Sequence, residues 1–130
     1  MSIFKINKIS GELTEIDSSP ITAGAKPYSV TVDSSKRFVY VANWGSHNVS
    51  AFVINSTTGA LSEVVGSPYV ADWFPYAVVV DKNSKYAYVA NNGSANISAY
   101  TINKNTGALD KLNGSPFRAD EGPYALAISH

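Results

Sequence analysis

Residues 27–74 read PYSVTVDSSKRFVYVANWGSHNVSAFVINSTTGALSEVVGSPYVADWF, and residues 75–122 repeat this stretch without a gap. The two segments are identical at 25 of their 48 positions. The identities fall in short blocks: Pro-Tyr, Tyr-Val-Ala-Asn, Gly-Ser, Thr-Gly-Ala-Leu and Gly-Ser-Pro. A repeat with a period of roughly 20–50 residues is typical of proteins built from stacked copies of one supersecondary unit. We therefore expect each 48-residue segment to be one such unit.

The same register continues at both ends of the chain. Residues 1–26 align with residues 49–74, and Pro123-Tyr124 begins a third copy. We therefore predict a single domain over residues 1–130. It consists of a partial unit at 1–26, full units at 27–74 and 75–122, and the first strand of a further unit at 123–130.

Each full unit has the pattern of four β-strands, which we name a, b, c and d in chain order. β-Branched and aromatic residues dominate four runs of the first unit, and turn residues separate them. The predicted strands are 28–32, 37–43, 49–54 and 61–65. Asp33 begins the a–b turn, where its side chain can bond the backbone two residues on. Gly59 supplies the positive φ of a bulged c–d hairpin, and no helix is predicted.

Strand b is apolar on both of its faces. Phe38 and Tyr40 point to one side, and Val39 and Val41 point to the other. A sheet with one face in water would alternate apolar and polar residues, so this strand is predicted to lie between two neighbouring layers. Four strands per roughly 40–50 residues, packed in this way, make a β-propeller blade. The predicted fold class is therefore all-β, with propeller blades of four-stranded antiparallel sheet.

The repeated blocks resemble those of a known family. Tyr-Val-Ala-Asn, Gly-Ser, Val-Ser-Ala-Phe, Thr-Gly-Ala-Leu and Gly-Ser-Pro are similar to the blocks of the YVTN or lactonase-type seven-bladed β-propellers, which include 6-phosphogluconolactonase-like proteins. The resemblance covers essentially the whole chain, and it implies a propeller and an activity on sugar lactones. Because the blocks recur in every blade as turn and packing residues, they indicate the fold better than the function.

The chain is too short for seven blades of this kind. Seven units of 48 residues would need about 336 residues, whereas two full units plus 34 residues are present, about 2.7 blades. A row of blades leaves two apolar end faces, because repeats bury their core only by stacking. Two alternatives follow: the partial propeller closes with further copies of itself, head to tail, or it is a segment of a longer propeller. A ring of copies would lack strand b in each composite blade.

Composition excludes several classes of partner and site. The chain has ten basic and ten acidic residues and no cysteine. A net charge of zero argues against a nucleic-acid groove and against an anionic membrane patch. The absence of cysteine excludes disulfides, thiolate metal sites and a cysteine nucleophile. We expect no cofactor, and because no signal peptide or membrane-length apolar run is visible, we expect a cytoplasmic protein.

The resemblance implies a ligand face built from the b–c loops and from the connections that lead into each strand a. These segments are 23–28, 43–48, 71–76, 91–96 and 119–124. A sugar-like small molecule is the expected ligand. The candidate ligand-binding residues are Lys26, Trp44, His47, Asp72, Trp73, Arg118, Asp120 and Glu121.

Each candidate residue has a functional interpretation and a structural one. His47 is a weak candidate for a general base, although Ala95 occupies the equivalent position and the residue is otherwise a solvated loop histidine. Asp72 and the equivalent Asp120, with Glu121 as a further carboxylate, could act as acid or base, could bind a divalent cation, or could cap turns. No metal-ligand spacing is present, so we predict no metal site. Lys26 could hold a phosphate or be an ordinary surface charge.

The aromatic residues of the same segments can either pack between blades or stack against a sugar. They are Tyr28, Trp44, Trp73, Phe74, Tyr76 and Tyr124. Two functions remain open from the sequence. The first is a scaffold or binding module that assembles through its blade faces and has no catalytic set. The second is a lactonase-like hydrolase whose site forms only in the complete propeller, and a cell-surface adhesion repeat is a third reading.

Overall fold

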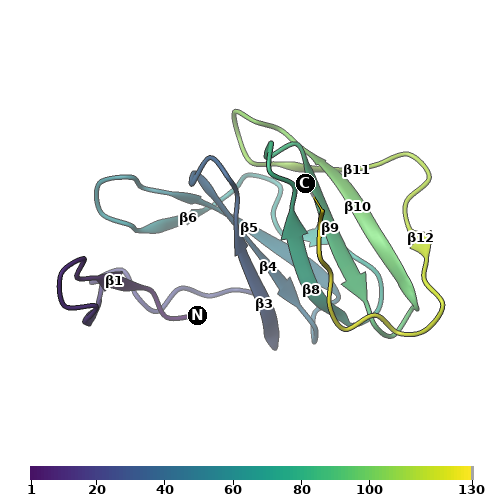
Figure 1. The fold of residues 1–130 in the computed structure, drawn as a ribbon, viewed down its shortest axis with the longest axis horizontal. Helices are drawn as coiled ribbons and strands as arrows, with labels where there is room; N and C mark the ends of the chain where they lie inside the picture. Colours follow the sequence, from purple (N-terminus) through teal and green to yellow (C-terminus); the bar gives the residue numbers. More distant parts are fainter. Residues whose placement is uncertain (130) are drawn as a thin grey trace.

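The structure is a computed structural model that describes residues 1–129. These residues form twelve strands in three antiparallel sheets. Figure 1 shows the N-terminal hairpin, the first full sheet and the second full sheet following one another in chain order. The predicted all-β fold with propeller blades is thus confirmed. Nothing within the described range is a helix that could cross a membrane.

The first full sheet has the strand order predicted for a blade. It contains β3 (Pro27–Val32), β4 (Phe38–Asn43), β5 (Asn48–Ile54), β6 (Leu61–Glu63) and β7 (Tyr69–Val70), in the order β3-β4-β5-β6. The outer strand was predicted at 61–65, but it is divided into two pieces. β6 and β7 both pair with β5, and a break separates them. Ser67 lies in that break, and its Oγ accepts the Ala51 N–H at 3.0 Å. The side chain thereby replaces a missing backbone acceptor of the ladder.

The second full sheet repeats the first. It contains β8 (Pro75–Val80), β9 (Tyr86–Asn91), β10 (Asn96–Ile102), β11 (Leu109–Lys111) and β12 (Phe117–Arg118). Its outer strand is split in the same way, and Ser115 Oγ accepts the Ala99 N–H at 2.9 Å. The Gly-Ser-Pro block is therefore the sequence signal of a broken outer strand.

The two ends of the chain carry less structure. At the N-terminus, β1 (Phe4–Ile6) pairs with β2 (Leu13–Glu15) in a hairpin whose strand residues are all exposed. At the C-terminus, residues 123–129 were expected to be strand a of a further blade, but they form no strand. The strand b that would hydrogen-bond to them is not present in the chain. His130 of this predicted strand lies outside the described residues.

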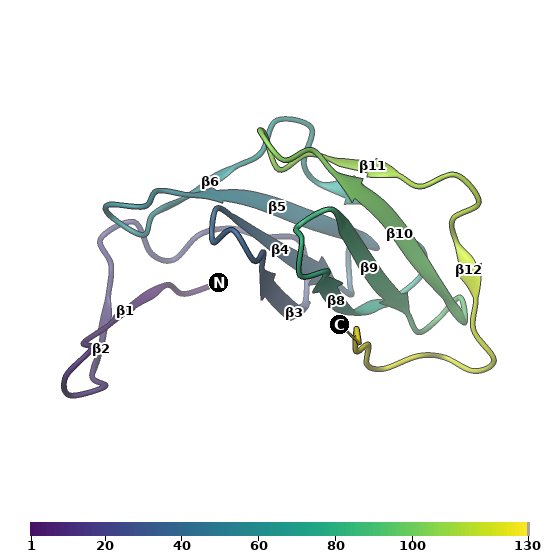
Figure 2. The same ribbon diagram turned by 45° about the horizontal axis from the view of Figure 1, so that its top comes forward.

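Strand β4 is buried along its whole length, as its sequence predicted. Phe38 and Tyr40 belong to an apolar cluster that lies between the two full sheets. Val39 and Val41 belong to a second cluster, on the side of the N-terminal segment with Met1 and Ile21 packed against it. The sheet is therefore a middle layer with a neighbour on each face. Figure 2 shows the inner strands β3 and β8 side by side, with β6 and β11 toward the outer rim.

The a–b turns are held by their leading aspartates. Asp33 accepts the N–H groups of Ser35, Arg37 and Phe38 at 3.1, 2.9 and 2.8 Å. Burial alone would raise the pKa of Asp33, but hydrogen bonds from Ser35, Phe38, Ser84 and Arg37 bring it below its ordinary value. Asp81 accepts the equivalent bonds in the second sheet. The predicted aspartate turns are thus confirmed.

Candidate functional site

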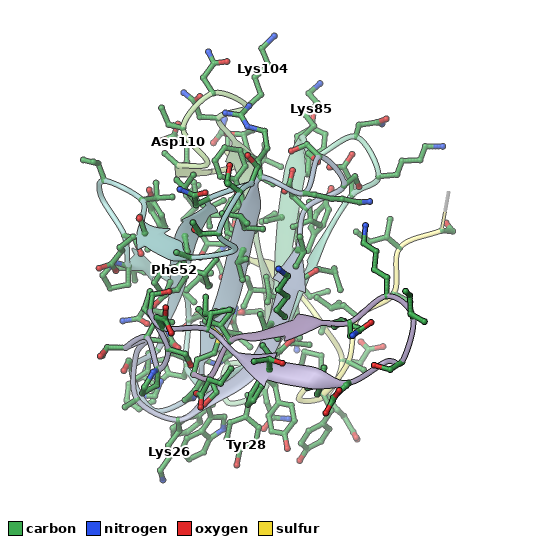
Figure 3. All side chains as sticks on the ribbon, turned by 90° about the vertical axis from the view of Figure 1, so that its left-hand side faces the viewer. Lys26, Tyr28, Phe52, Lys85, Lys104 and Asp110 are labelled. Atoms are coloured by element: carbon green, nitrogen blue, oxygen red, sulfur yellow. The ribbon has the colours of Figure 1, made fainter. Side chains whose placement is uncertain are left out.

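The loops that sequence analysis selected gather at one end of the sheets. We call this the loop end, made of residues 23–28, 43–48, 71–76, 91–96 and 119–124 together with the candidate Arg118. We call the opposite end, with the a–b and c–d turns, the turn end. In Figure 3, Lys26 and Tyr28 lie at one end of the molecule, and Lys85, Lys104 and Asp110 lie at the other. The fold therefore separates the candidate ligand face from the hairpin turns.

Each connection is fastened to the b–c loop of the sheet that it enters. Trp44 N donates to Lys26 O at 2.9 Å, and Gly45 N donates to Ala25 O at 3.0 Å. In the next copy, Asn92 N and Gly93 N donate to Phe74 O and Trp73 O, each at 3.0 Å. Because backbone groups make these bonds in both copies, the loop end has the same geometry in both blades.

Buried asparagines support the b–c loops from below. Asn43 Nδ2 donates to Asn48 Oδ1 at 2.8 Å and to Ser50 Oγ at 2.9 Å. The second sheet repeats this arrangement with Asn91, Asn96 and Ser98. These residues were not among the candidates, although their repeated spacing Asn-x4-Asn-x-Ser is a signal in the sequence that could have found them. Their Nδ2 groups hold the loops in shape, and Asn91 Oδ1 also accepts the N–H of Asp72 at 3.3 Å.

Asp72 is used to fix the connection between the two sheets. Its carboxylate accepts from Ser94 Oγ at 2.7 Å, from Asn96 Nδ2 at 2.8 Å and from Trp73 N at 2.9 Å. The bonds from Asn96 and Ser94 lower the pKa of Asp72. A carboxylate held ionised by three donors is a poor proton acceptor, so this geometry suits a turn cap better than a general base.

Two of the remaining charged candidates, Arg118 and Asp120, adjoin that network. Arg118 and Asp120 line a pocket of about 340 Å³ together with Ser94 and Asn96. Glu121 is exposed in the connection that follows. Lys26 is exposed, and its Nζ lies 4.9 Å from the centroid of the Trp44 ring, in the range of a cation–π contact. The structure therefore divides the candidates between two places at the loop end.

The aromatic candidates form one continuous row of ring contacts, which we call the aromatic stripe. Successive ring centroids are 5.4, 4.9, 4.4, 6.0, 4.7 and 5.0 Å apart. In that order, the stripe consists of Trp73, His47, Phe74, Trp44, Tyr28, Tyr76 and Tyr124. It crosses both full sheets and ends on the segment that follows them.

His47 is an integral part of this stripe. Its Nδ1 accepts the N–H of Phe74 at 3.1 Å, and both residues have positive φ angles, of 54° and 56°. A neutral imidazole has one acceptor nitrogen, so the proton is on Nε2 when Nδ1 accepts. The lone pair that a general base needs is then already occupied. In this geometry His47 positions the backbone of Phe74.

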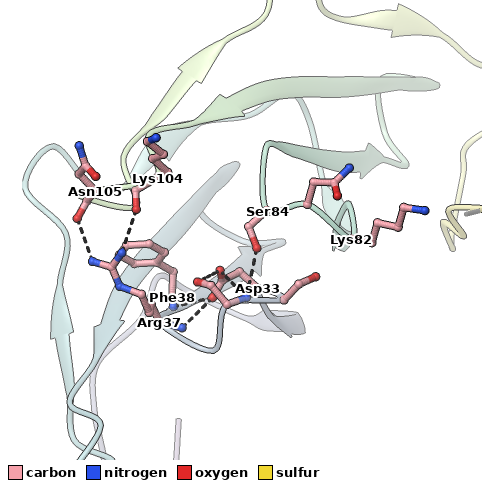
Figure 4. A pocket seen from close by; sticks show the side chains of 10 residues that line it. Asp33, Arg37, Phe38, Lys82, Ser84, Lys104 and Asn105 are labelled. Carbon is pink, nitrogen blue, oxygen red and sulfur yellow. Dashed lines mark hydrogen bonds between the residues drawn. The ribbon is translucent and has the colours of Figure 1, made fainter.

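A pocket of about 510 Å³ lies at the turn end, where sequence analysis placed no candidate (Figure 4). Arg37 donates across it to the carbonyls of Lys104 and Asn105, at 3.0 and 3.2 Å. Ser35 N donates to Ser84 Oγ at 3.2 Å. These polar groups tie the turns of the two sheets together, which explains the pocket as a gap between blades. Across residues 1–129, no group of three or more potential metal ligands is found.

The comparisons with known proteins agree with this architecture. The profile of the family described as "Lactonase, 7-bladed beta-propeller" matches residues 1–73, more than half of the chain. The chain therefore belongs to this lactonase-type propeller family. No curated protein matches it.

Solved structures show the same fold at low identity. A putative 6-phosphogluconolactonase from Bacteroides uniformis has a TM-score of 0.80 at 20% identity, over 95% of this chain and 36% of its own. The Pseudomonas aeruginosa periplasmic gluconolactonase has a TM-score of 0.79 at 17% identity, over 97% and 35%. A putative 6-phosphogluconolactonase from Bacteroides fragilis has a TM-score of 0.76 at 19% identity, over 95% and 34%. The chain thus spans about a third of the length of these structures.

Proposed function

We propose that this chain is a propeller scaffold that acts as a binding module, with the loop end as its ligand surface. The observation that carries the proposal is the aromatic stripe. It brings seven rings into successive contact, and three of them, Tyr28, Trp73 and Tyr124, are exposed. The two best catalytic candidates, His47 and Asp72, already use acceptor atoms within the fold. A surface of this kind recognises a ligand by shape and stacking without needing a reactive group.

We further propose that the module assembles through its exposed blade faces with copies of itself. Ser29 Oγ accepts the N–H of Val78, so Ser29 faces the second sheet. Because side chains alternate along a strand, Val30 and Val32 of β3 point the other way, where they are 58% and 52% exposed. Such an apolar face is the surface that a further blade would cover. The remaining blades of a longer chain are the alternative occupant.

Light scattering after size exclusion tests the assembly. We expect a mass of at least two chains of 13.9 kDa each, and we expect Val30→Lys to lower it. Val65→Lys is the matched control, because Val65 is 95% exposed outside any strand. A stable species of 13.9 kDa for the unaltered chain would contradict self-assembly.

A second candidate function is the hydrolysis of sugar lactones, which membership of the lactonase-type family favours. The site would then form only in the complete propeller, because such sites take residues from several blades. Hydrolysis of glucono-δ-lactone by the assembled oligomer isolated by size exclusion, measured against buffer, distinguishes the two functions. We expect no rate above buffer. A rate that the unaltered chain shows and His47→Ala lacks would overturn the non-catalytic proposal. The cytoplasmic location stays a prediction.

A further inference from the structure

We propose that the aromatic stripe binds an uncharged oligosaccharide along its length, with several sugar rings engaged at once. The inference rests on the proposed binding function and specifies its ligand. Trp73, Tyr28 and Tyr124 are 62%, 53% and 65% exposed, so three rings of the stripe present their surfaces to solvent. The stripe joins rings from both full sheets, which is a longer surface than one sugar ring can cover.

The chemistry of the side chains favours a saccharide. A pyranose ring has an apolar face of C–H groups and a polar edge of hydroxyls. Tyrosine and tryptophan match this pattern, because each combines a large apolar face with a hydrogen-bonding edge. Lys26 Nζ, close to the Trp44 ring, and His47 Nε2 add polar atoms beside the rings.

The stripe is also held in place before any ligand arrives. Trp73 N donates to Ser94 Oγ and to Asp72 Oδ1, each at 2.9 Å. Phe74 is held by His47, and its ring stacks on Trp44 at an interplanar angle of 19°. Binding to rings that are already ordered avoids most of the entropic cost of immobilising side chains.

The charge of the loop end selects against the main competing ligand, single-stranded nucleic acid. The loop end carries the cations Lys26 and Arg118 and the carboxylates Asp72, Asp120 and Glu121, for a net charge of −1. Nucleic acids also stack on aromatic rings, but their binding needs cations that neutralise phosphates. Five of the seven cations in residues 27–122 lie instead at the turn end: Lys36, Arg37, Lys82, Lys85 and Lys104. A nearly neutral aromatic surface therefore fits an uncharged chain.

Intrinsic fluorescence tests the proposal directly, because both tryptophans of the chain belong to the stripe. The assembled protein is titrated with cellohexaose, mannohexaose and maltohexaose, and with glucose for comparison. We expect at least one hexasaccharide to change the tryptophan emission, with an affinity at least about tenfold above that of glucose. Equal affinities for glucose and all hexasaccharides would overturn binding along the stripe.

Variants locate the site. Trp73→Ala removes an exposed ring, and we expect it to weaken hexasaccharide binding about tenfold or more, measured by calorimetry. Phe117→Ala is the matched control, because Phe117 is an exposed aromatic residue on β12 outside the stripe. An unchanged affinity in Trp73→Ala, or an equal loss in both variants, would contradict the assignment.

Two further probes separate a wrong ligand from a wrong function. If no hexasaccharide binds but an oligothymidylate or a proline-rich peptide changes the tryptophan emission, the ligand class is wrong and the binding module stands. If none of these probes binds and the chain is a monomer in solution, the proposed function itself is wrong.

Discussion

Replacing Gly107 with alanine probes how tightly the two full sheets pack at the turn end. A Cβ atom at position 107 would lie 2.7 Å from Cε1 and 2.8 Å from Cγ of the Phe38 ring. Phe38 is only 2% exposed, so its ring cannot move into solvent to make room. The carbonyl of Gly107 also accepts the hydroxyl of Tyr40 at 3.0 Å, which ties the turn to the same core.

Gly59 is the matched control for this substitution. It occupies the equivalent turn of the preceding repeat with the same φ of 78°, but a Cβ there would meet nothing within 4 Å. Gly59→Ala therefore reports the backbone cost alone. A left-handed conformation costs an alanine about 1–2 kcal/mol, and the stiffer unfolded chain returns about 0.4–1 kcal/mol. We expect Gly59→Ala to lower the free energy of unfolding by about 0.5–1 kcal/mol.

Gly107→Ala has the same backbone cost plus the overlap with Phe38. Forcing an extra methyl group into a packed core costs about 1–3 kcal/mol. We therefore expect a total loss of about 2–4 kcal/mol, and a difference of about 1–3 kcal/mol between the two variants. Urea unfolding followed by circular dichroism measures both losses in parallel.

The comparison has a clear refuting outcome. Equal losses for Gly59→Ala and Gly107→Ala would show that Phe38 does not pack against the turn as described. The same substitution in a Phe38→Leu variant adds a check. Leucine replaces the ring with a smaller side chain, so Gly107→Ala should lower the free energy of unfolding less in this variant. A coupling energy near zero in this double-mutant cycle would refute the contact independently.

Two other predictions concern titration. Hydrogen bonds lower the pKa of Asp72 below its ordinary value of 3.8, so the ionised carboxylate stabilises the fold fully above pH 3.8 and this stabilisation is lost as the pH falls below it. Asp72→Asn should therefore lose stability less steeply below pH 3.8 than the unaltered chain. An equal slope of unfolding free energy against pH would contradict the role of Asp72 as a turn cap. The hydroxyl of Tyr100 donates to Val70 O at 2.6 Å, and burial raises the pKa of Tyr100 to about 12. The free energy of unfolding should fall as the pH rises from 10 toward 12, because the unfolded chain loses the Tyr100 proton first. Tyr100→Phe should reduce that fall and should lower the free energy of unfolding by about 1 kcal/mol at neutral pH. The same dependence on alkaline pH in the variant and in the unaltered chain would argue against a buried hydroxyl.

Much of the blade could be predicted from the residues alone, because its signals are local. The unbroken apolar run Phe38–Val41 reports burial on both faces of one strand, because successive side chains of a strand point to opposite faces. The aspartate turn at Asp33 closes within a few residues. The 48-residue period reports stacking, because identical units bury their faces against one another.

The loop end, by contrast, was decided by tertiary structure. The Phe74 N–H reaches His47 Nδ1 only because both residues adopt left-handed backbone conformations in different segments. The split outer strand depends on Ser67 reaching across to Ala51. Candidate residues could be collected from loops in the sequence, but the side-chain partners of Asp72 and the backbone partner of His47 lie 22–27 positions away.

The sequence by itself thus determined a repeated four-stranded blade and the loops that share one end of it. The tertiary structure alone decided that seven rings join into one stripe. It also decided that the acceptor atoms of His47 and Asp72 are hydrogen-bonded within the fold. The physical reason is distance along the chain. Periodicity and turn chemistry act between near neighbours, whereas ring contacts and loop hydrogen bonds depend on how whole sheets are placed against each other.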